Sequence, residues 1–300
     1  MARLTREIKN YAAAGECVMT LGFFDGVHLG HSALLKRLSE ISRETGLPAL
    51  ALTFDVRPLE RSYLLLTSLE ERVRLLSAAG LDDVVVQSFS KEFASMSPRE
   101  FLRDVVRDVL KARVILAGYD CCFGKDRSGN IETLKAFSQE LGYLCEEEKP
   151  FLLDGRIVSS TLCRELLGKG ELSKLEECLG RPWSLGGPVK EGMKIGRELG
   201  FPTANLSLEG LLTPPAGVYS AVCDLGGRSA KALLYLGTRP TFRGQEKVAE
   251  AFILDFSGDL YGREIRITPG KMIGEEKRYE SAADLKAAIE GFAKILREED

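Results

Sequence analysis

The hydrophobic pattern of this 300-residue chain changes between Arg181 and Gly187, and this change constrains the fold more than any other feature. Before it, apolar strand-like segments alternate with segments whose apolar residues recur at helical spacing. After it, apolar runs are short and are separated by glycine and proline. The first pattern predicts a parallel sheet with helices on both faces, and the second predicts an antiparallel barrel or sandwich. We therefore expect two domains, residues 1–182 and 183–300.

The same patterns locate the individual elements. In the first half we expect strands over 17–24, 50–54, 84–87 and 114–117. We expect helices there over 32–44, 68–79 and 97–111, because each has apolar residues at helical spacing or a capping sequence at its start. In the second half we expect strands over 217–223, 230–236, 248–256 and 264–267. The chain should close with an amphipathic helix over 281–296, its apolar face made by Leu285, Ile289, Phe292 and Ile295.

Composition and charge exclude several classes of protein. The net charge of −3 gives no overall attraction to a polyanion, so nucleic acid is not an expected partner. The seven cysteines are irregularly spaced and form no Cys-x-x-Cys pair, which argues against a disulfide framework or a zinc site and favours a reducing compartment. No apolar stretch reaches membrane-spanning length, and residues 1–14 lack the apolar core of a signal peptide. We therefore expect a cytoplasmic protein with no membrane partner.

The chain contains two histidines, His28 and His31, at an expected strand-to-helix junction. Side chains three residues apart on a helix face the same way. Gly30 between them has no Cβ and would let a phosphate approach closely, while the helix start offers N–H donors and a positive dipole end. These features predict an anion site for charge developing on a nucleotide α-phosphate, with no covalent nucleophile required. The alternative is a pair of surface histidines or metal ligands.

The segment Gly-x-Phe-Asp-Gly-Val-His-x-Gly-His over residues 22–31 resembles the signature of the nucleotidyltransferase half of bacterial bifunctional riboflavin kinase/FAD synthetases. Further motifs at 53–55, 118–129 and 159–164 follow in the family's order. The resemblance implies a Rossmann-like FMN adenylyltransferase domain with a parallel sheet, in which His28 and His31 are catalytic. It implies nucleotide or phosphate contacts from Gly22, Phe24, Asp25, Gly30, Ser159, Ser160, Thr161 and Arg164. It implies flavin contacts from Asp120, Phe123, Arg127 and Asn130.

The last of these motifs has a physical explanation. Ser160 and Thr161 are expected to open a helix, so that their hydroxyl and N–H groups can hold a β- or γ-phosphate. Arg164 lies three residues after Thr161 and can pair with that phosphate through two parallel hydrogen bonds. Taken alone, the serines would be an ordinary helix cap and the arginine a solvated surface charge.

In the second half, the stretch from Gly192 to Asn205 is rich in glycine and carries Lys194 and Arg197. A glycine loop with two basic side chains can surround phosphates, and Thr203 and Asn205 supply oxygen ligands suited to Mg²⁺. The stretch is not a Walker A loop, because it lacks the Gly-Lys-Ser/Thr sequence. On these residues alone, a charged hairpin loop is an equal alternative.

The sequence Gly-Phe-Pro-Thr-Ala-Asn over residues 200–205 is similar to the hallmark motif of riboflavin kinases, and the resemblance extends over 186–285. It implies an antiparallel β-barrel with a terminal helix. It also implies that Glu250 is the general base on the ribityl 5′-hydroxyl of riboflavin and that Thr203 and Asn205 hold Mg²⁺ on ATP. The whole chain is then expected to convert riboflavin to FMN and FMN to FAD with ATP, releasing pyrophosphate in the second step. Its expected partners are these small molecules, with self-association left open.

Several positions depart from the family pattern. Arg57 stands where the family usually has histidine, and Cys121 and Cys122 stand where it often has an aromatic and a polar or basic residue. In the second half, Phe252 replaces a usual histidine and Gly274 replaces a usual arginine. The last two departures are expected to affect the kinase reaction.

Three other functions are alternatives. The first is an FMN adenylyltransferase whose second domain binds flavin without phosphorylating it, and Gly274 motivates it. The second is a cytidylyl- or adenylyltransferase of lipid or pantetheine metabolism, against which the segment Pro202–Asn205 argues. The third is a non-catalytic flavin-binding regulator, which would not require a general base such as Glu250.

Overall fold

The computed structural model describes residues 2–55, 64–192, 196, 199–241 and 244–298. It divides into two compact units, one made of residues 1–63 and 69–160 and the other of 64–68 and 161–300.

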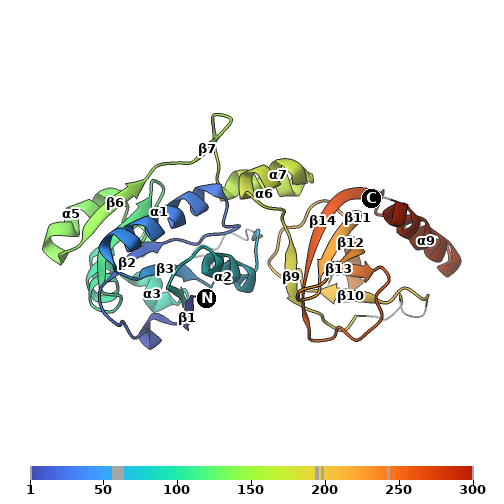
Figure 1. Ribbon diagram of the computed structural model, residues 1–300, viewed down its shortest axis with the longest axis horizontal. Helices are drawn as coiled ribbons and strands as arrows, with labels where there is room; N and C mark the ends of the chain where they lie inside the picture. Colours follow the sequence, from blue (N-terminus) through green and yellow to red (C-terminus); the bar gives the residue numbers. More distant parts are fainter. Residues whose placement is uncertain (1, 56–63, 193–195, 197–198, 242–243, 299–300) are drawn as a thin grey trace. The chain divides into compact units, whose positions relative to one another are not determined.

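The first unit is built on a six-stranded sheet in the order β1-β4-β3-β2-β5-β6, in which every neighbouring pair is parallel (Figure 1). The strands are β1 (Arg3–Arg6), β2 (Cys17–Leu21), β3 (Ala49–Phe54), β4 (Asp83–Gln87), β5 (Ala112–Gly118) and β6 (Leu144–Glu148). The helices and helical turns are η1 (Ile8–Asn10), α1 (Leu29–Thr45), α2 (Leu69–Ala78), α3 (Lys91–Ser95), α4 (Pro98–Glu100), η2 (Phe101–Arg107), η3 (Lys125–Arg127) and α5 (Ile131–Leu141). A small hairpin pairs β7 (Leu152–Leu153) with β8 (Arg156–Ile157).

Side chains of the central strands alternate between two apolar cores, one on each face of the sheet. In β2, Met19 packs into the core that contains η2 and α5, whereas Val18 packs into the core that contains α1 and α2. Continuous apolar strands of this kind are typical of a parallel sheet covered on both faces. The predicted parallel sheet with helices on both faces is confirmed.

The strand order places the first functional segment. After β2, the next two strands, β3 and β4, are added on one side of β2 in the sheet. The later strands β5 and β6 are added on its other side. The order of the strands therefore reverses between β2 and β5. In open parallel sheets, ligands bind outside the carboxyl ends of the strands at such a reversal. The histidine-containing segment follows β2 directly, and the loop that begins at Tyr119 follows β5.

The predicted helix over 97–111 begins as expected but continues differently. Ser97 forms a capping box with Glu100, and Pro98 occupies the first turn. After Glu100 the chain winds as a π-helix, η2, in which the Asp108 N–H donates to the Arg103 carbonyl at 3.0 Å. The wider turn buries four apolar side chains against the sheet: Phe101, Leu102, Val105 and Val106. Packing has therefore overridden the ordinary α-helical spacing.

The second unit contains a six-stranded antiparallel sheet in the order β10-β13-β12-β11-β14-β9. The strands are β9 (Leu185–Pro188), β10 (Thr203–Leu206), β11 (Gly217–Asp224), β12 (Ser229–Thr241), β13 (Gly244–Ile253) and β14 (Glu264–Glu275). Just beyond β9, the Lys190 N–H donates to the Asn205 carbonyl at 2.9 Å, which joins the two edges of the sheet. The predicted antiparallel barrel is confirmed, and β14 is longer than the expected strand over 264–267.

Helices α6 (Ser160–Lys169) and α7 (Leu172–Leu179) precede the barrel, and α9 (Ala282–Glu298) ends it. The predicted terminal helix is confirmed, but its apolar face is not as expected. Ile295 is 44% exposed, whereas Leu296 is 5% exposed and packs beside Leu233 and Leu254 of the barrel. At about 100° per residue, Leu296 lies roughly 20° from Leu285 around the helix and Ile295 roughly 80° from it. Ile295 was therefore wrongly placed on the buried face.

Candidate active sites

The chain after β2 makes a tight turn that brings His28 to the start of α1. Phe24, Gly26 and Val27 have φ values of 56°, 80° and 39°, all in the left-handed region. This conformation is unfavourable for an aromatic and especially for a β-branched residue, and it persists only where the surroundings impose it. Phe24 and Val27 are both buried, so packing holds the turn.

The two histidines are in contact, although only His31 lies within the helix. His28 is the N-cap residue of α1, with extended backbone angles, and its Nδ1 accepts a hydrogen bond from the His31 N–H at 3.4 Å. The rings are stacked, with centroids 3.7 Å apart and planes 21° apart, and the edge of Phe24 packs on His31. His28 is 5% exposed. The pair therefore lies at the positive end of a helix that begins beside the sheet's reversal point.

Gly30 and Gly22 both lie close to other atoms of this turn and its neighbours. A Cβ at Gly30 would lie 3.2 Å from the Nδ1 of His28 and 3.3 Å from the carbonyl oxygen of Val158. Likewise, a Cβ at Gly22 would lie 3.0 Å from the ring of Phe24. These glycines make room for neighbouring parts of the protein itself. That Gly30 also lets a phosphate approach closely stays a prediction.

The expected phosphate motif begins at this turn. Asp25 is 1% exposed, and the hydroxyl of Ser160 donates to its backbone carbonyl at 3.0 Å. Ser159 is half-buried just before it. Helix α6 begins at Ser160, as predicted. Thr161 and Arg164 follow on this helix within the second unit, Thr161 exposed and Arg164 half-buried.

Arg72 on α2 was missed by the sequence reasoning. Its side chain is fully buried, and it donates to the carbonyl oxygens of Phe23 at 3.0 Å and Phe54 at 2.6 Å. Its guanidinium also lies over the Phe23 ring, and the hydroxyl of Thr53 donates to the same Phe23 carbonyl. Arg72 thus ties together the loops that leave β2 and β3. The available signal was an arginine on the apolar side of α2, one turn before Leu76.

We expect Arg72→Met to destabilise the first unit by about 3 kcal/mol, because buried carbonyls lose charge-assisted donors. Since Phe23 directly precedes the turn that carries His28, FAD formation should fall as well. Calorimetry with parallel assays of both reactions checks this, with Arg43→Met at an exposed position of α1 as the control. An unchanged melting temperature in Arg72→Met would contradict the assigned role.

The residues expected to contact flavin are scattered in the loop after β5. Asp120 and Arg127 are exposed, and Arg127 has a φ of 58°. Phe123 is 6% exposed and packs against Phe101 in the core at a centroid distance of 5.6 Å. The side-chain oxygen of Asn130 caps α5 by accepting from the Thr133 N–H. Phe123 and Asn130 therefore have structural roles that the sequence interpretation did not include.

The two neighbouring cysteines differ in environment. Cys121 packs against the same core as Phe123, and burial raises the pKa of its thiol to about 12, whereas Cys122 is exposed. Position 121 therefore supports the loop from the inside, and position 122 faces solvent.

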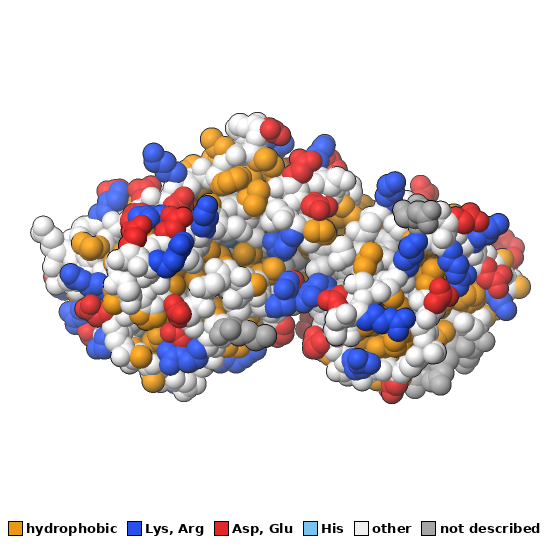
Figure 2. All heavy atoms as spheres, in the orientation of Figure 1, with side chains coloured by type: hydrophobic (Ala, Val, Ile, Leu, Met, Phe, Trp, Pro, Cys, Tyr) orange, Lys and Arg blue, Asp and Glu red, His pale blue; other side chains and the backbone are white. Residues whose placement is uncertain are grey.

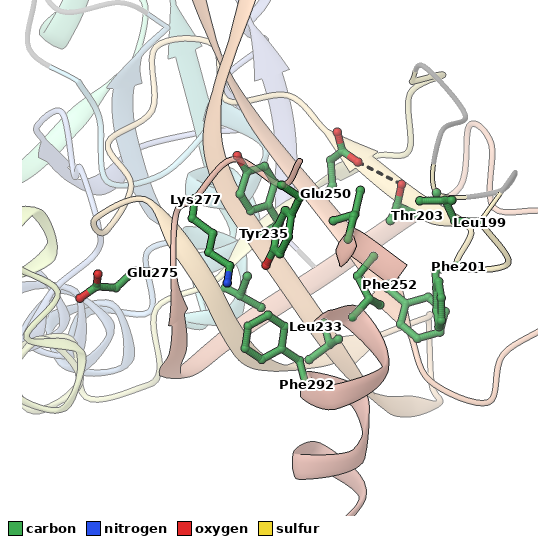
Figure 3. A pocket seen from close by; sticks show the side chains of 15 residues that line it. Leu199, Phe201, Thr203, Leu233, Tyr235, Glu250, Phe252, Glu275, Lys277 and Phe292 are labelled. Carbon is green, nitrogen blue, oxygen red and sulfur yellow. Dashed lines mark hydrogen bonds between the residues drawn. The ribbon is translucent and has the colours of Figure 1, made fainter. Parts of the chain in front are cut away.

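In the second unit, a cavity of about 330 Å³ opens on the outside of β10, β12 and β13 and is closed on one side by α9 (Figure 3). Most of its lining is apolar or aromatic, including Leu233, Phe252, Ile289 and Phe292. Glu250 and Thr203 also line it, and the Thr203 hydroxyl donates to the Glu250 carboxylate at 3.2 Å. The cavity therefore combines an apolar wall with a carboxylate and a hydroxyl group, the composition expected of a small-molecule site.

Strand pairing explains how these polar groups meet. Asn205 lies opposite Glu250 in β13, and Glu250 lies opposite Tyr235 in β12. Thr203 and Asn205 share one face of β10 because side chains alternate along a strand. A Cβ at Gly192 would lie 2.4 Å from the side chain of Asn205, so the glycine leaves room for this amide.

Some predicted residues cannot be placed in this way. Lys194, Arg197 and Arg57 lie outside the described residues. Within the described part of the chain, no cluster of three or more His, Cys, Asp or Glu side chains could hold a metal ion.

The two positions of the second half that depart from the family pattern, Phe252 and Gly274, lie beside the cavity. Phe252 lines it and packs edge-on against Phe201, with ring centroids 5.2 Å apart. A Cβ at Gly274 would lie 2.5 Å from the ring of Phe292. The space that a larger residue would need at position 274 is therefore filled by an aromatic side chain of α9, which forms part of the cavity wall.

No described helix has the length and apolarity that crossing a bilayer requires. Acidic and basic side chains are interspersed on the visible face of each unit, without a large region of one sign (Figure 2). Neither unit therefore presents on that face the basic surface typical of nucleic-acid binding.

Comparison with known proteins gives the family. Residues 11–162 match the family model for FAD synthetase, and residues 179–298 match the model for riboflavin kinase. The bifunctional riboflavin kinase/FMN adenylyltransferase of Escherichia coli K12 is 36% identical, with 96% of this chain and 94% of that protein covered. The protein of the same name from Bacillus subtilis is 31% identical, with 91% and 89% covered.

Among solved structures, one described as a macrolide-efflux protein from Streptococcus pneumoniae superposes with a TM-score of 0.83. It is 27% identical in sequence, and the match covers 100% of this chain and 99% of that one. The family models and the similar sequences agree with each other and with the order of motifs along the chain. The chain belongs to the family of bifunctional riboflavin kinase/FMN adenylyltransferases.

Proposed function

We propose that residues 183–300 phosphorylate riboflavin with Glu250 as the general base, and that residues 1–182 adenylylate FMN with His28 and His31 at the reacting phosphate. The enzyme makes FMN from riboflavin and FAD from FMN, using ATP in both steps. The observation that carries the kinase assignment is the contact between Thr203 and Glu250 in an otherwise largely apolar cavity. We place the enzyme in the cytoplasm.

The kinase cavity suits a flat aromatic ring that bears a polyol chain. The apolar and aromatic side chains can cover the ring, while Glu250 is available to the terminal hydroxyl of the chain. A carboxylate acts as a general base by accepting the proton as the hydroxyl oxygen attacks, and its position matters more than a shifted pKa. Glu250 is already oriented by the hydrogen bond from Thr203, which restricts its rotamers.

The residues beside Glu250 fit a magnesium ion. Thr203 offers a hydroxyl oxygen and Asn205 an amide oxygen, and both are hard donors of the kind Mg²⁺ takes in addition to substrate phosphates and water. They lie on the same strand face, next to a carboxylate. When bound, the ion would neutralise phosphate charge during transfer. We propose that Lys194 and Arg197 add positive charge at the same phosphates.

For adenylyl transfer, the first turn of α1 supplies the helix dipole and the stacked histidines supply donors near the strand reversal. A nucleotide phosphate bound there would gain negative charge in the transition state, which such donors stabilise. We propose that Gly22, Phe24, Asp25 and Gly30 shape this site. We further propose that Ser159, Ser160, Thr161 and Arg164 bind the leaving pyrophosphate, and that Asp120 and Arg127 contact the flavin.

The test is incubation of the purified protein with riboflavin, ATP and Mg²⁺, with flavins separated by chromatography over time. We expect FMN to appear first and then to convert to FAD. FAD formed from added FMN, but no product from riboflavin, would instead indicate an adenylyltransferase with an inactive kinase half.

A further inference from the structure

The residues between β14 and α9 form part of the cavity wall without regular structure of their own. Residues 276–280 belong to no helix or strand, and no backbone-to-backbone hydrogen bond holds them among the described residues. Nevertheless Lys277 and Tyr279 line the cavity, and the Lys277 ammonium lies 5.0 Å from the centre of the Tyr279 ring. Something other than a strand ladder must therefore hold this segment in place.

Glu276 supplies that connection. One of its carboxylate oxygens accepts a hydrogen bond from the Tyr235 hydroxyl at 3.0 Å and another from the Thr238 backbone N–H at 3.0 Å. Both donors belong to β12, so a single side chain fastens the irregular segment to the barrel.

Gly237 makes this connection sterically possible. A Cβ at position 237 would lie 2.1 Å from the Tyr235 hydroxyl oxygen and 2.7 Å from the bonded oxygen of Glu276. Both distances are too short for real atoms, so a side chain at 237 would displace the carboxylate, the tyrosine or both. The glycine and the glutamate are 39 residues apart in sequence. The same contact accounts for the presence of both residues.

The connection also reaches the strand pair that carries the general base. Tyr235 lines the cavity, where Figure 3 shows it together with Lys277, and it lies opposite Glu250 in the β12–β13 ladder. We infer that Glu276 is a positioning residue of the kinase site. Its carboxylate holds residues 276–279 against β12, so that Lys277 and Tyr279 complete the wall around bound riboflavin. This inference rests on the proposed kinase function.

The test compares Glu276→Ala with the wild type for riboflavin affinity, measured both as KM and as Kd by flavin fluorescence. We expect both constants to rise about tenfold, equivalent to about 1.4 kcal/mol. The kcat should change less than about threefold, because Glu250 is untouched. FAD formation from FMN should be unchanged, which shows that the first unit is folded, and an unchanged melting temperature shows that the barrel is folded as well.

Two further variants separate positioning from general stability. Glu276→Gln keeps an oxygen acceptor and should restore most of the affinity, whereas Gly237→Ala should weaken riboflavin binding as Glu276→Ala does. Glu280→Ala, an exposed neighbour at the end of the same segment, is the matched control and should behave as wild type.

Unchanged riboflavin affinity in Glu276→Ala would overturn the inference, as would a loss that Glu276→Gln shares in full. A loss of riboflavin binding that is accompanied by a lower melting temperature of the barrel would also overturn it, because that is the signature of a purely structural residue. If the wild type bound riboflavin but did not phosphorylate it, the proposed reaction would fail, and the Kd comparison would still decide the role of Glu276.

Discussion

Replacing Glu250 with glutamine should abolish most riboflavin phosphorylation, with kcat lower by about 10²- to 10⁴-fold, while FAD formation from FMN persists. Glutamine has nearly the same shape as glutamate, and its amide oxygen can still accept from the Thr203 hydroxyl 3.2 Å away. It cannot accept the proton of an attacking hydroxyl, and general-base catalysis has about that magnitude. The measurement is steady-state FMN formation from riboflavin, with FAD formation from FMN assayed in parallel.

The design of this experiment distinguishes catalysis from binding. The KM for riboflavin should change little, because the apolar wall of the cavity is unaffected. Glu264→Gln, an exposed position on β14, removes an equal charge from the same barrel and should have no effect. Full phosphorylation by Glu250→Gln would remove this carboxylate from the mechanism and direct attention to the other polar groups of the cavity.

In the first unit, we expect a substitution that impairs FAD formation and leaves FMN formation intact. Replacing His28 with alanine should lower FAD formation by about 10²- to 10³-fold, which is the effect of losing a preorganised donor to developing phosphate charge. FMN formation from riboflavin should be unaffected, because the barrel carries a separate site. Flavin chromatography from riboflavin and from FMN measures both outcomes.

A second substitution is required because His28 also caps α1. Its Nδ1 accepts from the His31 N–H, and loss of an N-cap costs about 1 kcal/mol by itself. Asparagine is among the best N-cap residues, so His28→Asn retains the cap but not the imidazole ring. If both variants lose FAD formation, the ring is needed for the reaction. Activity restored in His28→Asn would show that the histidine serves the helix and would refute its catalytic role.

The two residues near the kinase cavity that depart from the family pattern, Gly274 and Phe252, have a common physical explanation. Gly274 accommodates the Phe292 ring, and Phe252 packs against Phe201, so both positions contribute to an aromatic wall. A wall of this kind can bind an isoalloxazine ring by stacking and burial. The structure therefore gives no reason to associate these substitutions with loss of the kinase site.

The sequence alone determined the architecture, because hydrophobic periodicity is a local property. Alternating strands and helices specified the parallel sheet, short strands with turns specified the barrel, and the spacing of apolar residues located α9. Motif order likewise directed attention to His28, Glu250 and Thr203. These predictions depend on residues close together in the chain, where a pattern can be read without knowing the fold.

Only the tertiary structure determined which groups share a contact. Arg72 reaches the Phe23 carbonyl across 49 positions and Glu276 reaches Thr238 across 38, and no periodicity links such residues. The same limit explains why the contact of Gly30 with His28 and Val158 was not predicted. A glycine in a sequence does not reveal which atom needs its space. Local pattern thus specifies the elements, and long-range packing specifies the site.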